Sequence, residues 1–331
     1  MTKNHLPGSY EVLGVGAPFL DHVIKVSQAY LDTIEGEKGG MQPVDYATFR
    51  RIIDQSGVPV NLATGGSSSN TIKGLANLGH ACALVGKLGN DEAGETFIKG
   101  IQKLGITSLL QTTTTPTGQL VCIVGPDGER TFRDYFGASE EMCSSDLKPE
   151  FFEGVKLVHI EGYTLLRGDL TLKAMEMAKR AGAKVSFDLA SFELASSFKK
   201  EIVQMLTHHV DILFANADET RSLTGLTPDQ GCAILKDLCD IAVVSLNKEG
   251  CLIGHGPDVM HCMAYPVEPL DTTGAGDLFA AGFLHGYLTG ESLPQCAHYG
   301  ALTAAEVVQV FGAEIPAETW QHLRKKILGS S

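Results

Sequence analysis

The feature that most constrains the fold is a regular alternation of short apolar runs with helix-like segments. Residues 11–17, 58–66 and 82–89 have the apolar character of strands, and residues 67–79 and 91–105 read as amphipathic helices that end at glycines. Strands that alternate with helices form a parallel sheet with helices packed on its faces. The pattern therefore predicts a layered α/β fold.

Residues 117–137 interrupt this alternation. A Pro-Asp-Gly turn at 126–128 lies between two runs of alternating polarity, which is typical of a β-hairpin. Residues 23–27 also alternate, so we expect these pieces to form a small antiparallel sheet outside the main one. The whole chain, 1–331, then forms a single domain whose β lid is made of residues 22–57 and 117–137. We further expect strands at 155–160, 184–188, 210–215, 241–246 and 250–255, and helices at 47–57, 168–182, 199–208, 217–224, 229–239, 275–289, 293–310 and 316–328.

The charge balance argues against a polyanionic partner. The chain has 26 Lys and Arg against 39 Asp and Glu, a net charge of -13, whereas nucleic-acid and anionic-membrane proteins carry basic surfaces. No apolar run reaches the roughly 20 residues that span a bilayer. The N-terminal stretch MTKNHLPGSYEVLG lacks the apolar core of a signal peptide. We therefore expect a cytoplasmic protein with a small-molecule partner and neither a nucleic acid nor a membrane.

The cysteines and histidines show no metal-site spacing. None of the eight cysteines forms a CxxC pair, and most lie in apolar runs, which favours buried, reduced thiols. His208 and His209 are adjacent and cannot share one face of a helix, so a zinc site is not expected.

The strongest candidate for a chemical site is the stretch DTTGAGDLFAAGFLHG at 271–286. Phe279, Phe283 and Tyr287 recur at helical spacing, which predicts a helix that begins near Ala275. The first turn of a helix has free N–H groups and the positive end of the helix dipole. Small residues at this point let an anion approach the N–H groups closely.

Asp277 lies beside this predicted anion site. A carboxylate there repels a bound anion, so it is poorly suited to binding alone. It is well suited to take a proton from a hydroxyl that attacks a phosphoryl group. The alternative is that Asp277 is an ordinary acidic residue at a helix N-terminus.

Four motifs together resemble the ribokinase family, the PfkB carbohydrate kinases, which include adenosine kinases. DTTGAGDLFAAG resembles the second family signature, and GGSSSNTIKGLANLG at 65–79 resembles the first. NADE at 216–219 is similar to the family NxxE, and SLNKEGCLIG at 245–254 to a strand–turn–strand near the nucleotide. The resemblance implies a ribokinase-like three-layer α/β/α fold with a mainly parallel central sheet and a small β lid. It also implies a kinase that uses ATP and Mg²⁺.

The resemblance assigns the phosphate side of the site. Asp277 would be the catalytic base, and Gly274, Ala275 and Gly276 would form the anion hole for the γ-phosphoryl group. Asn216 and Glu219 would organise Mg²⁺ and the phosphates through water, a role compatible with capping the helix at 217–224. Asp271 and the Thr273 carbonyl resemble a site for K⁺. The residues implied to lie near the nucleotide are Ser245, Asn247, Gly250, Ala304, Val307 and Gly312.

The resemblance also assigns the acceptor side. Asp21 would bind sugar hydroxyls, and a carboxylate can accept from both hydroxyls of a cis-diol. Gly65, Gly66 and Asn70 would contact the same sugar, although the two glycines alone would also suit a simple turn. Glu161 follows a predicted strand and is expected to face this site.

The lid hairpin carries two arginines. Either Arg130 or Arg133 would reach the substrate phosphates on closure, and the alternative for Arg133 is a solvated charge on an edge strand. An exposed edge also favours a homodimer formed through the lid.

The acceptor is less constrained than the reaction. Residues 22–57 resemble the corresponding segment of bacterial adenosine-kinase-like members, so we expect the acceptor to be a nucleoside similar to adenosine. Ala17 stands where many adenosine kinases have Asn, and Asn247 replaces a common glycine, so ribose, fructose or a related sugar is the alternative. GVGAPF at 14–19 suggests a Rossmann oxidoreductase as a further alternative. This alternative is distant, because the stretch lacks the third glycine of the GxGxxG motif. A non-catalytic binding relative would not need Asp277, and no P-loop motif is present.

Overall fold

The computed structural model describes residues 10–329 and contains a nine-stranded main sheet. Its strand order is β16-β15-β14-β13-β12-β11-β1-β5-β7, and every pair from β7 to β14 is parallel. The last two pairs are antiparallel and form one edge. The strands are β1 (Val12–Val15), β5 (Cys82–Val85), β7 (Thr107–Ser108), β11 (Leu157–Glu161), β12 (Lys184–Asp188), β13 (Ile212–Asn216), β14 (Ile241–Ser245), β15 (Cys251–His255) and β16 (Asp258–Cys262).

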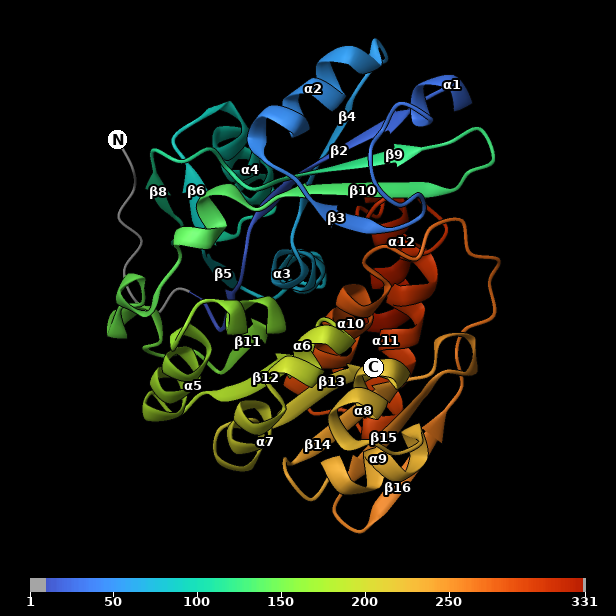
Figure 1. The fold of residues 1–331 in the computed structure, drawn as a ribbon. Helices are drawn as coiled ribbons and strands as arrows, with labels where there is room; N and C mark the ends of the chain where they lie inside the picture. The colour runs from blue at the N-terminus through green and yellow to red at the C-terminus, as the bar shows by residue number, and fades with distance from the viewer. Residues whose placement is uncertain (1–9, 330–331) are drawn as a thin grey trace.

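Helices cover both faces of the main sheet (Figure 1). Their apolar stripes pack on the central strands, which are buried on both faces and are apolar along their whole length. One face is covered by α3 (Ser67–Asn77), α4 (Glu92–Lys103), α10 (Ala275–Thr289) and α11 (Leu293–Val307), and α12 (Ala317–Leu328) packs beyond them. The opposite face is covered by α5 (Leu170–Arg180), α6 (Phe192–Ser197), α7 (Lys199–His208), α8 (Ala217–Thr224) and α9 (Pro228–Leu235).

A second sheet lies across the upper end of the main sheet (Figure 1). Its order is β3-β10-β9-β2-β4, and a hairpin joins β9 to β10 as expected. The expectation of a wholly antiparallel lid is wrong, because β2 pairs with β9 and β3 with β10 in parallel. The lid elements are β2 (Phe19–Lys25), α1 (Gln28–Leu31), β3 (Met41–Pro43), α2 (Tyr46–Ser56), β4 (Asn61–Gly65), β9 (Gln119–Val124) and β10 (Arg130–Tyr135).

Short elements complete the chain, and some of them differ from the sequence-based expectation. The strand β16 and the helix α6 were not expected, and α9 ends at Leu235 rather than at 239. The helix α11 ends at Val307 rather than at 310, because the Val308 carbonyl accepts from the N–H groups of Leu270 and Asp271. The remaining elements are β6 (Lys87–Gly89), β8 (Gln111–Thr113) and the 3₁₀ helices Gly137–Glu141, Ser144–Asp146, Pro149–Phe151, Gly162–Leu166 and Asn247–Glu249.

No helix between residues 10 and 329 combines the length and the apolar character needed to cross a bilayer. The N-terminal stretch on which we based the absence of a signal peptide lies mostly in residues 1–9, outside the described part of the chain.

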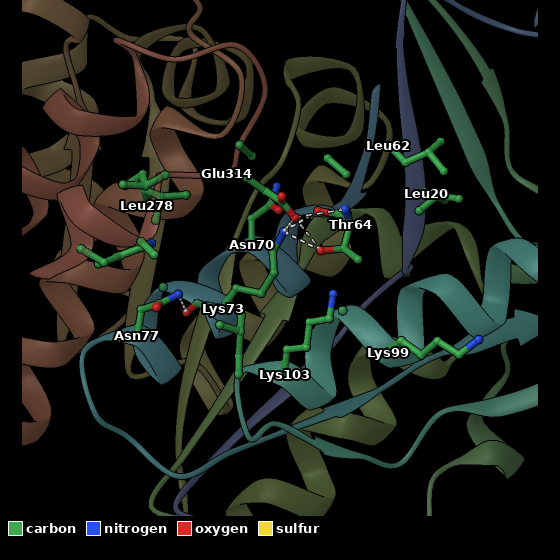
Figure 2. Close-up of a pocket in the computed structure, with 18 of the residues that line it drawn as sticks. Leu20, Leu62, Thr64, Asn70, Lys73, Asn77, Lys99, Lys103, Leu278 and Glu314 are labelled. Atoms are coloured by element: carbon green, nitrogen blue, oxygen red, sulfur yellow. Dashed lines mark hydrogen bonds and ion pairs between the residues drawn. The ribbon is translucent and has the colours of Figure 1, made fainter. Parts of the chain in front are cut away.

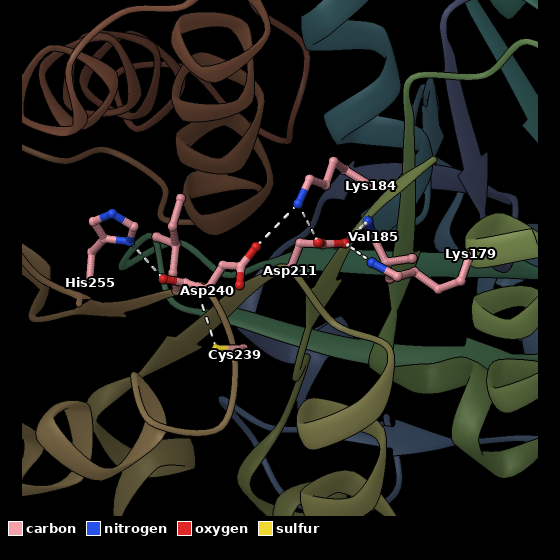
Figure 3. Close-up of polar contacts among 8 residues, drawn as sticks. Lys179, Lys184, Val185, Asp211, Cys239, Asp240 and His255 are labelled. Carbon is pink, nitrogen blue, oxygen red and sulfur yellow. Dashed lines mark hydrogen bonds and ion pairs between the residues drawn. The ribbon is translucent and has the colours of Figure 1, made fainter. Parts of the chain in front are cut away.

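A buried carboxylate ties the amino ends of the central strands together (Figure 3). Asp211, just before β13, accepts from Nζ of Lys179 at 2.8 Å, Nζ of Lys184 at 2.7 Å and the Val185 N–H at 2.8 Å. Burial raises the pKa of Asp211, but the hydrogen bonds from Lys179, Lys184 and the Val185 N–H together with the charge of Lys179 outweigh it and hold the pKa below its usual value. Lys184 also reaches the exposed Asp240 at 3.1 Å.

We predict that Asp211→Asn lowers the free energy of unfolding by about 1–3 kcal/mol near neutral pH, because it breaks charge-assisted hydrogen bonds to a buried group. The folded-state pKa of Asp211 is lowered, so its contribution is present above the unfolded pKa and is lost as the pH falls through the folded pKa. Urea unfolding at several pH values should show that the variant loses this acid dependence. Asp240→Asn is the control, and an equal effect there would contradict the prediction.

Candidate active site

The candidate site lies where the central parallel strands end, beneath the lid sheet (Figure 1). Three of these strands finish on polar residues: β11 on Glu161, β12 on Asp188 and β13 on Asn216. The carboxyl ends of parallel strands meet at one edge, where open α/β sheets bind ligands. Sequence reasoning missed Asp188, although its place at the end of a predicted strand was a usable signal.

Asp277 lies in the first turn of α10, which begins at Ala275 as predicted. Its two carboxylate oxygens accept from Ser67 Oγ at 2.7 Å and from Asn70 Nδ2 at 2.9 Å. Burial raises the pKa of Asp277, while the Asn70 and Ser67 hydrogen bonds and the charge of Lys73 lower it, and the net shift is upward. The carboxylate is thus fixed in direction and has a raised proton affinity, as a general base requires.

The turn at the start of α10 is closely packed at Gly274 and has free space at Gly276. Gly274 has φ +76°, and a Cβ there would lie 2.6 Å from the Ala313 Cβ. A Cβ on Gly276 would meet nothing within 4 Å. The turn therefore borders open space at Gly276, where an anion can approach the helix N-terminus. The Ala275 N–H already donates to the Thr272 carbonyl oxygen at 3.2 Å.

The glycine pair at the start of α3 makes room for Asp21. A Cβ on Gly65 would lie 2.3 Å from Asp21 Oδ1, and one on Gly66, whose φ is +98°, would lie 2.2 Å from the Ala17 carbonyl oxygen. Burial raises the pKa of Asp21 to about 7, against the lowering effect of Lys73. Both glycines are therefore required by close packing, and a turn alone does not explain them.

Lys73 is a buried cation that sequence reasoning did not single out (Figure 2). Its Nζ donates to the carbonyl oxygen and the hydroxyl of Thr64 and lies 3.6 Å from Glu314 Oε1. Burial lowers the pKa of Lys73, and the charges of Glu314, Asp21 and Asp277 raise it, with a net downward shift. Lys73 is thus the positive charge that partly offsets the two acidic side chains expected to handle the acceptor.

A pocket of about 450 Å³ opens on the far side of Lys73 (Figure 2). It lies between lid strands β2 and β4, the helices α3 and α4, and the start of α12. Lys73 lines this pocket together with Lys99 and Lys103, which lie on α4.

Glu161 joins two parts of the site. Its carboxylate accepts from the Ala17 N–H and the Ser68 N–H, each at 2.7 Å. Burial raises its pKa to about 7. A Cβ on Gly16 would lie 2.4 Å from Glu161 Oε2, so the loop after β1 packs directly on this side chain. Glu161 thus positions the start of α3 beside the expected acceptor site.

Asn216 and Glu219 form a capping box at the start of α8. Asn216 Oδ1 accepts from the Glu219 N–H at 2.9 Å, and Glu219 Oε2 accepts from the Asn216 N–H at 2.8 Å. Burial raises the pKa of Glu219 to about 7, and burial together with the charges of Glu219 and Asp277 raises that of Asp188.

The carboxylates of Asp188 and Glu219 are suited to a divalent cation that keeps several coordinated water molecules. In residues 10–329 no three His, Cys, Asp or Glu side chains lie close enough to hold one metal ion directly. Mg²⁺ binds through few protein carboxylates, several waters and the substrate phosphates. Burial raises the pKa values of both Asp188 and Glu219, and the charge of Glu219 raises that of Asp188 further, so a nearby cation would stabilise their ionised forms. The oxygen donors therefore fit a water-bridged Mg²⁺.

Arg130 connects the lid to the anion-hole segment. It donates to Asp271 and, at 2.7 Å, to Thr273 Oγ1. Asp271 also accepts from the Thr273 N–H at 2.7 Å and the Gly312 N–H at 2.8 Å. The Asp271 carboxylate, which we expected beside K⁺, thus forms an ion pair with the Arg130 guanidinium in this structure. K⁺ would need other ligands, such as carbonyl oxygens.

Arg133 is not a solvated edge charge. Its side chain is 1% exposed and donates to the carbonyl oxygens of Glu35 and Glu37. It therefore holds the loop between α1 and β3 inside the lid, and the alternative that we stated for it is wrong.

The residues expected near the nucleotide lie at two places in the chain. Ser245 ends β14, and Asn247 and Gly250 lie in the turn between β14 and β15. Ala304 lies in α11, and Gly312 lies in the loop after it. Asn247 has φ +56°, a left-handed conformation that asparagine tolerates almost as glycine does, which explains the departure at this position.

Comparison with known proteins agrees with this geometry. The model of the pfkB family carbohydrate kinases matches residues 53–320. Adenosine kinase 1 of Arabidopsis thaliana is 26% identical over 331 aligned residues, which cover 92% of this chain and 96% of that protein. Aminoimidazole riboside kinase of Salmonella typhimurium is 30% identical over 232 residues, which cover 66% of this chain and 72% of that protein.

Solved structures support the same assignment. The adenosine kinase from Sinorhizobium meliloti superposes with a TM-score of 0.86 at 29% identity, covering 96% of this chain and 99% of that one. A probable sugar kinase from Rhizobium etli CFN 42 superposes with a TM-score of 0.87 at 29% identity, covering 97% and 99%. The expected ribokinase-like α/β fold is thereby confirmed. The chain belongs to the pfkB family of carbohydrate kinases and is a sugar or nucleoside kinase.

Proposed function

We propose that this protein transfers the γ-phosphoryl group of ATP to a primary hydroxyl of a nucleoside similar to adenosine. The observation that carries the reaction is Asp277, a fixed carboxylate with a raised pKa beside the open first turn of α10. The similarity to the adenosine kinase of Sinorhizobium meliloti over 96% of the chain supports the nucleoside.

In the proposed reaction Asp277 takes the proton of the acceptor hydroxyl as its oxygen attacks the γ-phosphorus. The proton comes to rest on a carboxylate oxygen, while Ser67 and Asn70 keep the side chain aimed at the acceptor. The first-turn N–H groups of α10 bind the charge that develops on the transferred group. Mg²⁺, held through water near Asn216, Glu219 and Asp188, would neutralise phosphate charge.

The acceptor would lie between Asp21 and Asn70. Asn70 Oδ1 is buried and has no hydrogen-bond partner within the described chain, although its Nδ2 donates to Asp277. A buried amide oxygen without a donor is costly, and a sugar hydroxyl would satisfy it. The half-buried Asp21, with its pKa raised to about 7, can accept from neighbouring hydroxyls of the same ribose.

A free sugar is the second candidate acceptor. Ala17 offers no polar side chain at the edge of the acceptor site, and its N–H is already used by Glu161. Fructokinase-1 of Oryza sativa subsp. japonica is 28% identical over 236 residues, covering 67% of this chain and 73% of that protein. The same base and anion hole would serve a ribose-like or fructose-like substrate.

We predict turnover of MgATP with adenosine, measured as ADP release, and weaker turnover with ribose or fructose. Inosine and guanosine extend the panel. Turnover with a free sugar alone would keep the chemistry and overturn the nucleoside acceptor, whereas no turnover by folded, ATP-binding protein would contradict the proposed reaction.

We predict that Asp277→Asn lowers kcat by about a hundredfold to ten-thousandfold, because the acceptor loses its base. Adenosine binding, measured by calorimetry, should persist, since an amide can still receive the Ser67 hydrogen bond. Asp218→Asn, an exposed acid in the first turn of α8, is the matched control. Equal losses in the two variants would remove Asp277 from the base role.

We predict that Lys73→Met shifts the acid limb of the kcat/KM profile to higher pH. Lys73 lowers the pKa values of Asp21 and Asp277, and both rise further without it, so each carboxylate needs a higher pH to ionise. The loss of activity should therefore be larger near about pH 6 than near about pH 8.

The control for Lys73 is Lys99→Met, because Lys99 lines the same pocket from the surface of α4 and is 68% exposed. Its profile should match that of the parent protein. A uniform loss at every pH in Lys73→Met, or a shift of equal size in Lys99→Met, would contradict the electrostatic role of Lys73.

A further inference from the structure

Two thiols face each other at the edge of the main sheet. Cys251 on β15 lies directly opposite Cys262 on the antiparallel strand β16. Opposed residues place their side chains on the same face of a sheet, and both cysteines pack in one core cluster with their neighbours Ile253 and Met260. The Cα atoms of opposed residues lie about 4.5 or 5.5 Å apart, within the roughly 4.4–6.8 Å that a disulfide spans. The Cα spacing of this pair is therefore compatible with a disulfide.

The two thiols differ in exposure and in acidity. Cys251 is 1% exposed, whereas Cys262 is only partly buried. The neighbouring Cys251 thiol lowers the pKa of Cys262 to about 7 against the effect of burial, and the charge of His261 lowers it further. The pKa of Cys251 is raised by the same interaction. Cys262 is thus the thiol that supplies a thiolate near neutral pH, and the thiolate is the nucleophilic form.

We propose that Cys251 and Cys262 form a redox-active thiol pair that a hydroperoxide converts to a disulfide. The Cys262 thiolate attacks one peroxide oxygen and becomes a sulfenic acid as hydroxide leaves. The Cys251 thiol then attacks that sulfur, its proton passes to the departing hydroxide, and the disulfide forms. With hydrogen peroxide, two thiols lose two electrons and two protons, and two molecules of water result; a dithiol reductant reverses the change.

The position of the pair places this bond beside the turn proposed for the nucleotide. Gly250 precedes Cys251, and a Cβ on Gly250 would lie 2.0 Å from the Cys262 carbonyl oxygen. After Cys262 the chain runs through 263–270 to Asp271 in the anion-hole segment. The thiol chemistry itself depends on neither ATP nor the acceptor, so the proposal stands apart from the proposed function.

The test treats the reduced full-length protein with hydrogen peroxide near neutral pH and follows it by mass spectrometry. The intact mass should fall by about 2 Da and recover with dithiothreitol. Cleavage before aspartates puts Cys251 in the peptide 240–257 and Cys262 in the peptide 258–270, each with a single cysteine. These two peptides should be found linked, at least about tenfold faster than the exposed Cys143 is oxidised.

Two variants separate the roles of the thiols. In Cys251→Ser the resolving thiol is absent, so Cys262 should become a sulfinic acid and gain about 32 Da. Fragmentation of the peptide 258–270 must place this gain on Cys262, because Met260 and Met263 lie in the same peptide and also take up oxygen. In Cys262→Ser the peptide 240–257 should stay unmodified at the same peroxide dose. Oxidation of Cys262 no faster than that of Cys143, linkage of Cys262 to another cysteine, or no mass loss in folded protein would overturn the proposal.

Discussion

The hydrogen bonds from the start of α3 to Asp277 are the interaction on which the site depends. Ser67 and Asn70 reach 210 and 207 positions along the chain to hold one carboxylate. The helix α3 follows lid strand β4 directly through the pair Gly65 and Gly66, so the element that aims the proposed base also continues the lid. The proposed acceptor site, the proposed base and the lid are therefore joined through α3.

The contacts around α3 bring several acidic side chains close together in a half-buried space. Nearby donors and one cation offset the unfavourable burial of these carboxylates. Burial raises the pKa values of Asp21, Glu161 and Asp277, and each would be easier to protonate without compensation. Glu161 receives two backbone N–H donors, Asp277 receives two side-chain donors, and Lys73 supplies a positive charge to Asp21 and Asp277. The pKa of Asp277 consequently stays above its usual value while its two donors fix the carboxylate in place, as a general base requires.

The sequence predicted best those features that repeat or lie close together in the chain. Aromatic spacing placed the start of the helix at Ala275, and the turn at 126–128 predicted the lid hairpin, both as observed. Long-range partners could not be predicted in this way, because an ion pair leaves no periodic pattern. Lys73 meets Glu314 across 241 positions, and neither residue stands out in the sequence. Arg130 meets Asp271 across 141 positions, and although each is a candidate site residue, nothing in the sequence pairs them.

These two long-range contacts have a shared consequence for the proposed lid. Glu314 accepts from Thr64 on β4, and Arg130 on β10 pairs with Asp271, so the loop around Gly312 and the segment before α10 each hold one lid strand. Both segments belong to the proposed nucleotide side, while both strands belong to the acceptor side. Any movement of β4 or β10 away from these segments must therefore break the contact of Thr64 with Glu314 or that of Arg130 with Asp271, so the two proposed halves of the site are coupled through these side chains.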